Sequence, residues 1–547
     1  MNTRGITARI TLLGFLISIP TYAEEKPPEL TGLFPHGASR GKTVTVTAFG
    51  TLPSWPLDSW MCGEHEGETN LTCKVLDEKG KLEISIPGDS KPGIYWLRLY
   101  NKVGASSPRP FLVSDLPDTI EKEPNDSSDE APDLEKSGLM IHGRLGKKGD
   151  VDSYAVNLEA NDILIADLLA NRVLASPMDG SLQITSAEGF VLAENDDDQE
   201  MDPRIVFRAP APGRYVVRIF SFPAEPNSSI QFSGEGGYIY RLALTTGPFI
   251  EYAYPLAAGL DPPTEVALHG WNIPEDRKMI KLPPAGKRSL DFIRIPGAAN
   301  AAPLMRENCR SLTEEDYANR NRLPEPTGTL VVSGRIGSPG ERDTYVFFAL
   351  EKENFEVSVR ARRVGSLLDP VLTVKDAESK TITEKDDTDG GLDCTTQFTA
   401  GENKAYRIEI RDRFNHGGQR FFYMLRIARP ARGFSLKLES DSFVLEKGKK
   451  LEIPVTIERH HGYEGKILIT AVDLPEGVRS TTAESLHGKD SAKAVKIIIE
   501  SDAAPLGIPF RISGSDGSDG AAARWAGYNV PGRKTPLRKA WLTVKGG

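Results

Sequence analysis

The amino-acid sequence predicts an all-β protein, a tandem array of β-sandwich domains. Short runs alternate between apolar and polar residues, as in 42–49 (KTVTVTAF) and 215–220 (YVVRIF), which is the pattern of strands with one buried face. The 547 residues include 51 Gly and 39 Pro, which favour tight turns between such strands. A long module also occurs twice, which indicates a series of domains rather than a solenoid of short repeats.

The first element is a predicted secretory signal over residues 1–23. Arg4 and Arg9 precede an apolar core at 10–19, and Ala23 provides a small-residue cleavage site. The core is shorter than the roughly 20 residues that span a bilayer. We therefore expect a chain that is exported and has no transmembrane segment. Its location would be secreted, periplasmic or at the cell surface. Removing both arginines takes the net charge from −9 to −11, which argues against a nucleic-acid partner.

The exported part is predicted to contain five domains, placed by two repeats. Residues 33–52 and 254–273 share an aromatic-Pro start, an alternating strand and a glycine near its end. Each precedes one copy of the longer module. The expected ranges are 24–115, 116–247, 248–308, 309–430 and 431–547. In the last domain we expect strands at 449–457, 466–472 and 494–499, and a flexible loop at 514–520.

The longer module carries the most specific pattern. It reads HGRLGKKGDVDSYAV from His142 and SGRIGSPGERDTYVF from Ser333, and the two stretches align without a gap. The shared positions are Gly143 with Gly334, Asp152 with Asp343, and Tyr154 with Tyr345. This match predicts that both copies fold into the same sandwich.

The module resembles the bacterial pre-peptidase C-terminal (PPC) domain, also known as a collagen-binding domain of secreted collagenases. The resemblance rests on motifs in family order at 121–126 (EKEPND), 149–154 (GDVDSY), 195–197 (NDD) and 212–215 (PGRY). It implies a jelly-roll-like sandwich, often joined to secreted proteases, with binding or maturation roles. The domains before the two modules resemble IPT/TIG-like sandwiches, and the last domain looks immunoglobulin-like.

An acidic cluster in the first module is the candidate metal site. Ca²⁺ takes six to eight oxygen ligands, and crowded carboxylates repel one another unless a cation lies between them. The family resemblance implies a Ca²⁺ ion between the acidic linker and the sheet. Its ligand positions would be Glu121, Glu123, Asn125, Asp126, Asp150 and Asp152. The alternative is a solvated linker with ordinary aspartate turns.

The second module departs from this pattern. In a gapless register, Leu312 replaces Glu121 and Tyr317 replaces Asp126. The acidic residues that remain are Glu314, Asp316, Glu341 and Asp343. With two ligands lost, the second module is predicted to bind Ca²⁺ weakly or not at all. The acidic stretches at 195–198 and 386–387 are interpreted as turns between strands.

No catalytic motif stands in the structural context that it requires. The sequence has no HExxH helix and no CxxC pair, and its GxSxG string at 37–41 (GASRG) precedes an expected strand rather than forming the strand-to-helix elbow of a hydrolase. His460 and His461, followed by Glu464, are interpreted as a polar hairpin tip rather than a metal site. We therefore assign no catalytic residue and no organic cofactor, although distant residues can still assemble a triad.

Cysteine and aromatic residues give further expectations. Cys62 and Cys73 are close in sequence and are predicted to form a disulfide after export, whereas pairing of Cys309 with Cys394 stays open. Surface aromatics often anchor ligands. The candidates are Trp55, Trp60, Tyr238, Tyr240 and residues 421–423, for which core packing is the alternative.

These patterns favour a secreted, non-enzymatic binding or adhesion scaffold of the bacterial cell envelope, stabilised by Ca²⁺. Its partner would be an extracellular protein or polysaccharide, presented along an extended rod of sandwiches. A substrate-binding or maturation accessory of an exported peptidase is the alternative. An enzyme with its site in the last domain is a third possibility. Because fold does not imply function, both main interpretations rest on analogy.

Overall fold

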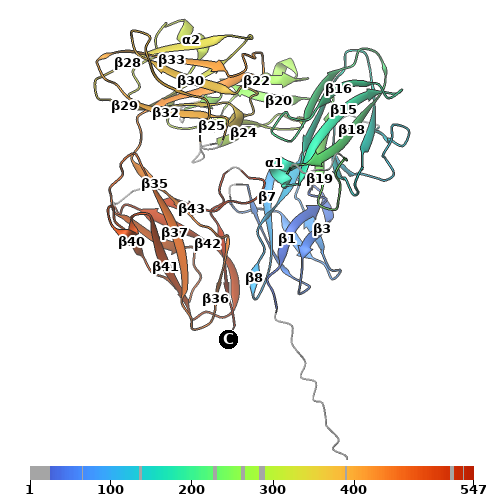
Figure 1. Ribbon diagram of the computed structural model, residues 1–547. Helices are drawn as coiled ribbons and strands as arrows, with labels where there is room; N and C mark the ends of the chain where they lie inside the picture. The colour runs from blue at the N-terminus through green and yellow to red at the C-terminus, as the bar shows by residue number, and fades with distance from the viewer. Residues whose placement is uncertain are drawn as a thin grey trace, which may run out of the picture.

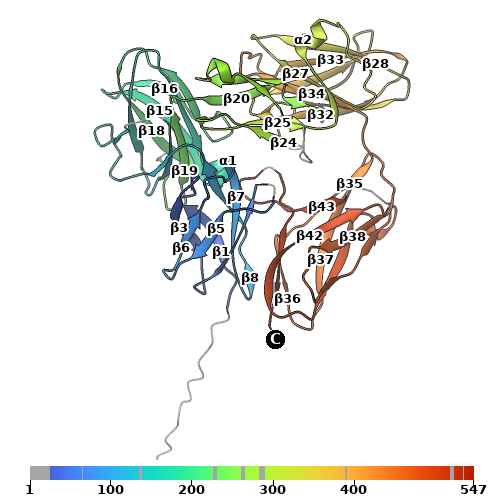
Figure 2. The same ribbon diagram turned by 180° about the vertical axis from the view of Figure 1, so that it is seen from behind.

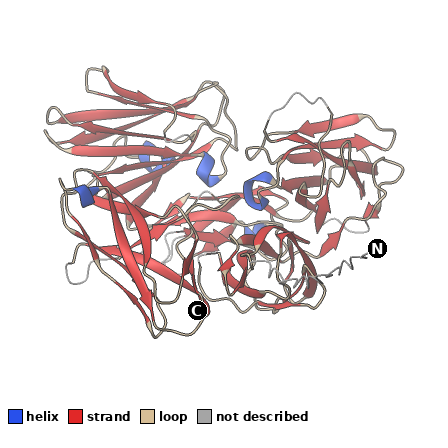
Figure 3. Ribbon diagram, turned by 60° about the horizontal axis from the view of Figure 1, so that its bottom comes forward, coloured by secondary structure: helices blue, strands red, loops and turns tan. Residues whose placement is uncertain are grey.

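The computed structural model describes residues 25–64, 66–134, 138–225, 231–259, 265–282, 290–388, 391–517, 523–533 and 535–546. Within these ranges strands dominate and the helices are short (Figure 3). No helix there has the length and apolar character that crossing a bilayer requires. The predicted signal at 1–23 lies outside the described residues. The fold class is the predicted one, an all-β array of sandwiches.

Domain 1, blue in Figure 1, packs two sheets face to face. Their orders are β1-β3-β6-β5 and β2-β9-β7-β4, with β8 on β7. The strands are β1 (Glu29–Phe34), β2 (Gly37–Ser39), β3 (Thr43–Thr51), β4 (Asp58–Gly63), β5 (Thr72–Val75), β6 (Lys81–Ser85), β7 (Gly93–Asn101), β8 (Gly104–Ala105) and β9 (Arg109–Ser114). Alternate residues such as Val46, Leu82 and Leu97 fill the core, as the period of a strand requires.

Domain 3 repeats this design with fewer strands, in the orders β20-β22-β23 and β21-β25-β24. Its elements are β20 (Phe249–Tyr254), β21 (Ala257–Ala258), β22 (Glu265–Trp271), η1 (Glu275–Arg277), β23 (Met279–Lys281), β24 (Leu290–Ile293) and β25 (Ala302–Arg306). The glycine that both domains share near the end of the alternating strand, Gly50 in domain 1 and Gly270 in domain 3, is required for steric reasons. A Cβ on Gly50 would lie 2.0 Å from Glu29 O, and one on Gly270 would lie 2.1 Å from Phe249 O.

Module 1, between domains 1 and 3 in sequence, has the sheets β10-β12-β19-β14-β17 and β11-β13-β18-β15-β16. Its elements are β10 (Asp118–Ile120), β11 (Asp133–Leu134), β12 (Leu139–Arg144), β13 (Asp152–Leu158), β14 (Ile163–Leu169), α1 (Asn171–Leu174), β15 (Met178–Ser186), β16 (Val191–Asn195), β17 (Arg204–Arg208), β18 (Gly213–Pro223) and β19 (Ile239–Thr245). Apolar residues from both sheets, among them Ile141, Leu182 and Leu242, form one core.

Module 2, which follows domain 3, has the sheets β26-β27-β34-β29-β32 and β28-β33-β30-β31. Its elements are β26 (Cys309–Thr313), α2 (Glu314–Ala318), β27 (Thr329–Arg335), β28 (Arg342–Ala349), β29 (Asn354–Arg360), η2 (Arg362–Val364), β30 (Pro370–Lys375), β31 (Thr381–Lys385), β32 (Cys394–Thr399), β33 (Lys404–Asp412) and β34 (Phe422–Ala428). Each strand has its counterpart in module 1 in the same order, with no described counterpart of β11. The gapless sequence match therefore reflects one shared topology.

Domain 5 is the immunoglobulin-like end of the chain, with the strand order β36-β44-β42-β43-β35-β37-β41-β39 and with β38 on β42 and β40. Its elements are β35 (Gly433–Lys437), β36 (Ser442–Leu445), β37 (Leu451–His460), β38 (Ile467–Val472), β39 (Val478–Ser480), β40 (Ala483–Ser485), η3 (Asp490–Ala492), β41 (Ala494–Ser501), β42 (Leu506–Ser515), β43 (Arg524–Gly527) and β44 (Ala540–Val544). The three expected strands correspond to β37, β38 and β41. The expected loop at 514–520 is wrong at its start, because Gly514 belongs to β42, and 518–520 lie outside the described residues.

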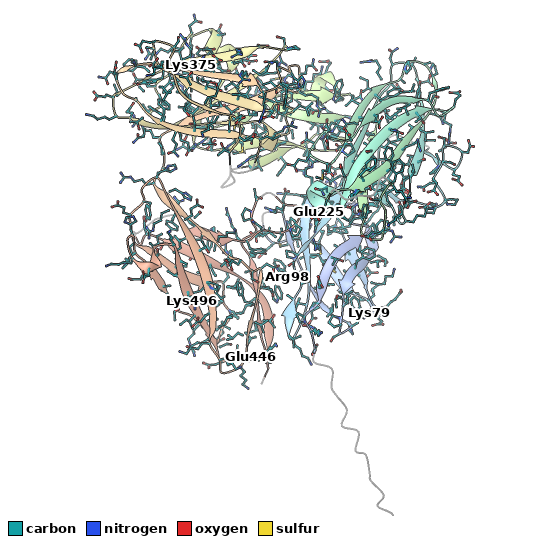
Figure 4. The ribbon with its side chains drawn as sticks, viewed as in Figure 1. Lys79, Arg98, Glu225, Lys375, Glu446 and Lys496 are labelled. Carbon is teal, nitrogen blue, oxygen red and sulfur yellow. The ribbon has the colours of Figure 1, made fainter. Side chains whose placement is uncertain are left out.

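The five domains close into a ring instead of an extended rod, as the two opposite views show (Figures 1 and 2). Trp541 of domain 5 packs against Trp60 and Tyr100 of domain 1, with ring centroids 5.9 and 4.5 Å apart. Buried Arg98, labelled in Figure 4 between these domains, lies 3.1 Å from Asp441. The rod expectation is wrong because domain 1 carries an outer aromatic face that needs cover.

The predicted Cys62–Cys73 disulfide is wrong for a related reason. Met61 packs against the core of domain 1, so the alternation of β4 turns Cys62 outward, into the cluster shared with domain 5. Cys73 packs against the domain 1 core instead. The sheet that contains β4 therefore lies between the Cys62 thiol and Cys73, which belongs to β5 of the facing sheet, and both thiols are free. Cys309 and Cys394 are free as well.

The aromatic candidates serve the fold. Trp55 donates its Nε1–H to Leu76 O at 2.7 Å, and Trp60 is covered by domain 5. Tyr238, which directly precedes β19, and Tyr240 on that strand are both buried in the core of module 1. In module 2, Phe422 and Tyr423 are equally buried. Core packing, the alternative considered for these residues, is what the structure has.

Candidate functional site

One corner of module 1 is built on a glycine and two tyrosines. Tyr240 lies across Gly143, where a Cβ would be 2.1 Å from the ring Cζ. The Tyr240 hydroxyl donates to Asp152 Oδ2 at 2.5 Å and lies 2.7 Å from the hydroxyl of Tyr154. The motif needs glycine at this position because any side chain would displace the tyrosine that holds the aspartate.

The same corner recurs in module 2. Tyr423 lies across Gly334, where a Cβ would be 2.5 Å from the ring Cζ. Its hydroxyl donates to Asp343 Oδ2 at 2.5 Å and lies 2.6 Å from the Tyr345 hydroxyl. The glycine–tyrosine frame (Gly143, Tyr154, Tyr240 and Asp152, with their module 2 counterparts) is therefore a property of the shared fold.

In module 1 the acidic linker adds oxygen atoms to this frame. One carboxylate oxygen from each of Glu123, Asp150 and Asp152 lies within 4.8 Å of the others. Asn125 is fully buried beside them, and its backbone oxygen accepts from Ser153 N at 2.9 Å. The Asn125 amide is best satisfied with its nitrogen donating to Glu123 Oε2 at 2.8 Å and to Asp152 Oδ1 at 3.2 Å, and turning the amide over would present its oxygen at the same place.

The remaining two candidate ligands flank this group and are held by other donors. Glu121 Oε2 accepts from the backbone N–H of Arg144 at 2.7 Å, and its carboxyl shares a hydrogen bond with that of Asp152. Asp126 Oδ2 pairs with Lys147 Nζ at 2.9 Å. All six predicted residues thus gather in one corner, where the linker meets the start of β13.

Burial and mutual repulsion strongly perturb these carboxyl groups. Burial, followed by the charge of Glu121, raises the pKa of Asp152 to about 9. Burial also raises the pKa of Glu121 to about 7, and raises the pKa values of Glu123 and Asp150. The hydrogen bond from Lys147 lowers the pKa of Asp126. Without a cation, the cluster therefore retains protons at neutral pH.

The donor set fits a hard cation. Carboxylate and amide oxygens are the ligands that Ca²⁺ prefers, and the group contains no sulfur or imidazole donor. The carboxyls of Asp126 and Asp150 share a hydrogen bond that requires a proton, and their Oδ1 atoms have no other hydrogen-bond donor among the described residues. A bound cation would take the place of that proton.

The gapless register is wrong ahead of the sheet in module 2. Thr313 pairs with Ser333 on β27 as Ile120 pairs with His142 on β12. Glu314, and not Leu312, therefore takes the place of Glu121, and its Oε2 accepts from Arg335 N at 2.9 Å. Leu312 is a core residue. The connection from this glutamate to the sheet is shorter in module 2, and the gapless match concealed this difference.

The two modules differ in structure along the segment after this glutamate. In module 2 the segment forms α2, and the Asp316 carboxylate accepts from Thr313 N at 3.0 Å as part of its capping box. Tyr317 packs on Tyr345 with ring centroids 4.9 Å apart, and its hydroxyl accepts from Val346 N at 3.1 Å. An aromatic ring thus lies against the frame of module 2. Among the described residues, three or more candidate ligand atoms converge only in module 1.

A second acidic stretch joins the modules to each other. Arg420 of module 2 binds both oxygens of Asp198 in module 1, at 2.6 and 2.8 Å, and donates to Glu251 of domain 3 at 2.6 Å. Arg204 of module 1 also donates to Glu251, at 3.2 Å. The interpretation of 195–198 as a simple turn missed this contact. Because the contact joins residues of three separate domains, no sequence pattern near 195–198 indicates it.

The histidine pair at the end of β37 makes an interdomain contact. His461 adopts a positive φ of 53° in the turn after the strand, as a hairpin tip would. Its Nε2 lies 3.4 Å from Glu356 Oε2 of module 2. No described group of metal ligands includes His460, His461 or Glu464.

Comparison with known proteins gives limited likeness. No family model matches the chain. A probable subtilase-type serine protease of Deinococcus radiodurans is 33% identical over 100 residues, which cover 18% of this chain and 14% of the protease. The chain therefore spans only a small part of that relative's length.

Solved structures share little beyond β-sandwich content. A Clostridium perfringens M60 catalytic domain with two CBM51 domains is 9% identical with a TM-score of 0.15, covering 75% of this chain and 55% of its own. The insect immune protein hemolin is 10% identical with a TM-score of 0.21, covering 92% and 100%. A Bacteroides ovatus glucan-locus protein with a bound heptasaccharide is 8% identical with a TM-score of 0.13, covering 72% of each chain.

Proposed function

We propose that this chain is a secreted, non-enzymatic binding protein of the bacterial cell envelope and that Ca²⁺ stabilises module 1. The observation that carries the proposal is the convergence of Asn125 with the carboxylates of Glu123, Asp150 and Asp152. Glu121 and Asp126 complete the donor set from the same linker. The jelly-roll and immunoglobulin-like sandwiches support a binding role, because each presents a rigid surface on which loops and edges vary.

The position of the cluster suggests what the ion does. Asp118, at the start of the same linker, accepts hydrogen bonds from Ser39 N and Oγ of domain 1 at 2.7 and 2.6 Å. Three residues later the linker enters the acidic cluster. A Ca²⁺ ion there would attach the linker to β13 and stiffen the joint between domain 1 and module 1. The ion would have to displace the protons that burial holds on Asp152 and Glu121.

The calcium part is tested by titrating the full-length exported chain after treatment with a chelator. We expect one Ca²⁺ per chain, with a Kd on the order of 10⁻⁴ to 10⁻³ M, as in other extracellular modules. The double variant Asp150→Asn, Asp152→Asn should lose binding. Its matched control in module 2, Glu341→Gln with Asp343→Asn, should bind as the natural chain does. Two equivalent ions, or none, would contradict the proposal.

The alternative is an accessory of an exported peptidase, and the likeness to a subtilase-type protease that bears on it covers 18% of this chain. Retention of the chain on insoluble collagen, chitin and peptidoglycan, compared with capture by a co-exported peptidase, separates the two. A peptidase and glycosidase screen addresses the possibility of an enzyme. Turnover that persists through purification and disappears on changing one histidine or aspartate would overturn the non-enzymatic proposal.

A further inference from the structure

Strand β16 lies at one end of the sheet β11-β13-β18-β15-β16 of module 1, with β15 as its strand partner. Eleven large apolar side chains are exposed among the described residues, and three of them are consecutive at this strand. They are Phe190, Val191 and Leu192, with exposed fractions of 71%, 50% and 43%. An exposed apolar edge strand is a template on which another chain can form a further strand.

The counterpart of β16 in module 2, strand β31, is protected against such pairing. The ladders β15–β16 and β30–β31 have the same register and the same bulge, so 190–195 correspond to 380–385. In module 2 both ends of this stretch are lysines, whereas in module 1 they are Phe190 and Asn195. Lysine side chains on an edge strand are a common protection against pairing with another chain. Because module 2 forms the same ladder with a protected edge, the fold does not require the apolar edge of module 1.

The free side of β16 also offers backbone groups. In an antiparallel strand with one partner, part of the N–H and C=O groups point away from that partner. At its last residue β16 reaches β17, where Asn195 Oδ1 accepts from Arg204 N at 3.0 Å. The stretch before this contact, 190–194, is where a further strand could pair. Another extended backbone presents donors and acceptors at the spacing of this row, so the complementary ligand is a peptide.

The charge around this edge is acidic. Between Arg172 and Arg204 the chain has eight acidic residues and no basic one. Asp198 and Asp202 pair with arginines. Four of the others are exposed on or beside the edge, namely Glu188, Glu194, Asp196 and Asp197. Basic side chains on an added strand would therefore be attracted, whereas a second copy of β16 would bring its own acidic residues and be repelled.

We propose that the free edge of β16 binds an extended peptide segment of a partner protein in which apolar and basic residues alternate. This inference rests on the proposed binding function and names its partner class and its site. The segment would pair its backbone with 190–194. Its apolar side chains would contact Phe190 and Leu192, and its basic side chains would lie near Glu188 and Glu194.

The test measures binding of three labelled peptides to the full-length chain by fluorescence anisotropy. The first peptide is KVKVKVKVK, and the second is its acidic counterpart EVEVEVEVE. The third, KVKPKVKVK, keeps all the lysines but loses one backbone donor and cannot form a continuous strand. KVKVKVKVK should bind at least about tenfold more tightly than either of the others.

Leu192→Lys should weaken binding of KVKVKVKVK at least about tenfold, because it gives β16 a lysine of the kind that protects β31. The matched control is Ile382→Lys at the equivalent position of module 2, where the natural side chain is 42% exposed. It adds the same charge to an edge that is already protected, and binding should be unchanged. Phe190→Lys with Val191→Thr, which copies the residues of module 2, is a second variant and should act as Leu192→Lys does. Because the replaced side chains are exposed, each variant should melt at the temperature of the natural chain.

Equal binding of the three peptides, binding of none, or binding that both β16 variants leave unchanged overturns the inference. Dimerisation of the natural chain that Leu192→Lys abolishes would identify a second copy as the occupant, and it overturns the inference as well. If the chain binds no peptide but is retained on collagen or peptidoglycan, the inference fails and the proposed function stands. Retention on no envelope material together with binding of no peptide overturns both.

Discussion

In module 1 the linker before the sheet places Asn125 against the carboxylates of Glu123 and Asp152, whereas in module 2 the corresponding linker winds into α2 and places Tyr317 against a tyrosine. The residues behind them are alike, because Tyr240 and Tyr423 each lie over a glycine and donate to an aspartate. The two modules therefore share the glycine–tyrosine frame but differ in the linker that packs in front of it.

This difference shows how a duplicated sandwich diverges. The glycine–tyrosine frame connects the two sheets and tolerates little change. The linker in front of it is local and mostly exposed, apart from buried residues such as Asn125, so its length and composition can vary at small cost to the fold. A sequence match across the frame therefore indicates that two modules share a fold. Whether a module can bind a cation has to be judged from the linker in front of the frame.

The largest expected effect falls on the frame and should be the same in both modules. Gly143→Ala would place a methyl group 2.1 Å from the ring of Tyr240, and Gly334→Ala one 2.5 Å from the ring of Tyr423. Each change should lower the unfolding free energy of its own module by about 3 kcal/mol. Hydrogen exchange resolved by module measures this. If one variant is tolerated, the two corners do not share a frame.

A smaller effect should separate the second acidic stretches of the modules. Asp198→Ala leaves Arg420 without its two-oxygen partner in a buried setting, and should cost about 2 kcal/mol. Asp387, in the corresponding turn of module 2, is exposed and its ion pair among the described residues is with Arg413, so Asp387→Ala should cost below about 0.5 kcal/mol. Denaturant unfolding of the full chain provides the comparison, and equal losses would contradict it.

The smallest effect is a difference in pH dependence in calcium-free buffer. Burial raises the pKa of Asp152 to about 9, so folded module 1 holds a proton that the unfolded chain releases. The stability this proton contributes is complete below the ordinary carboxyl pKa and is lost as pH rises through about 9. In module 2, burial raises the pKa of Asp343 only to about 6 and that of Glu314 to about 7. Their contribution is already mostly lost at pH 7.5.

Between pH 7.5 and 8.5, module 1 should therefore lose up to about 1.4 kcal/mol while module 2 changes little. Hydrogen exchange of β13 and β28, corrected for the intrinsic effect of pH, measures both in one sample. Added Ca²⁺ should remove the loss in module 1, because the ion replaces the proton. If the stability of the two modules fell equally with pH, their acidic corners would be electrostatically alike.

Much of this comparison could be anticipated from the sequence. Alternating runs predicted the strands, because a residue facing the core must be apolar at every second position. The repeated glycine, aspartate and tyrosine marked the frame, since they are fixed by contacts between neighbouring strands. The closeness of residues 121–126 to Asp150 and Asp152 was also expected from the motif order that the PPC-like pattern provided.

The errors have physical causes. The gapless register placed Leu312 opposite Glu121 because the linker is shorter in module 2, and backbone pairing, which the sequence does not display, sets the true register. The Cys62 prediction failed because closeness in sequence does not tell which face of β4 a side chain takes. The ring and the Asp198–Arg420 contact depend on surfaces that are far apart in the chain. The alternation of residues along one strand gives no information about such contacts.

The closure between domains 1 and 5 has a consequence for the order of assembly. Arg98 and Tyr528 approach within 3.4 Å although 430 positions separate them, so almost the whole chain must emerge before the contact can form. Until then, the outer face of domain 1, with Trp60 and Tyr100, stays uncovered in a newly made chain. Transiently exposed apolar surface is prone to aggregation. The vulnerable stage of biogenesis is thus the interval between the folding of the first sandwich and the arrival of Trp541.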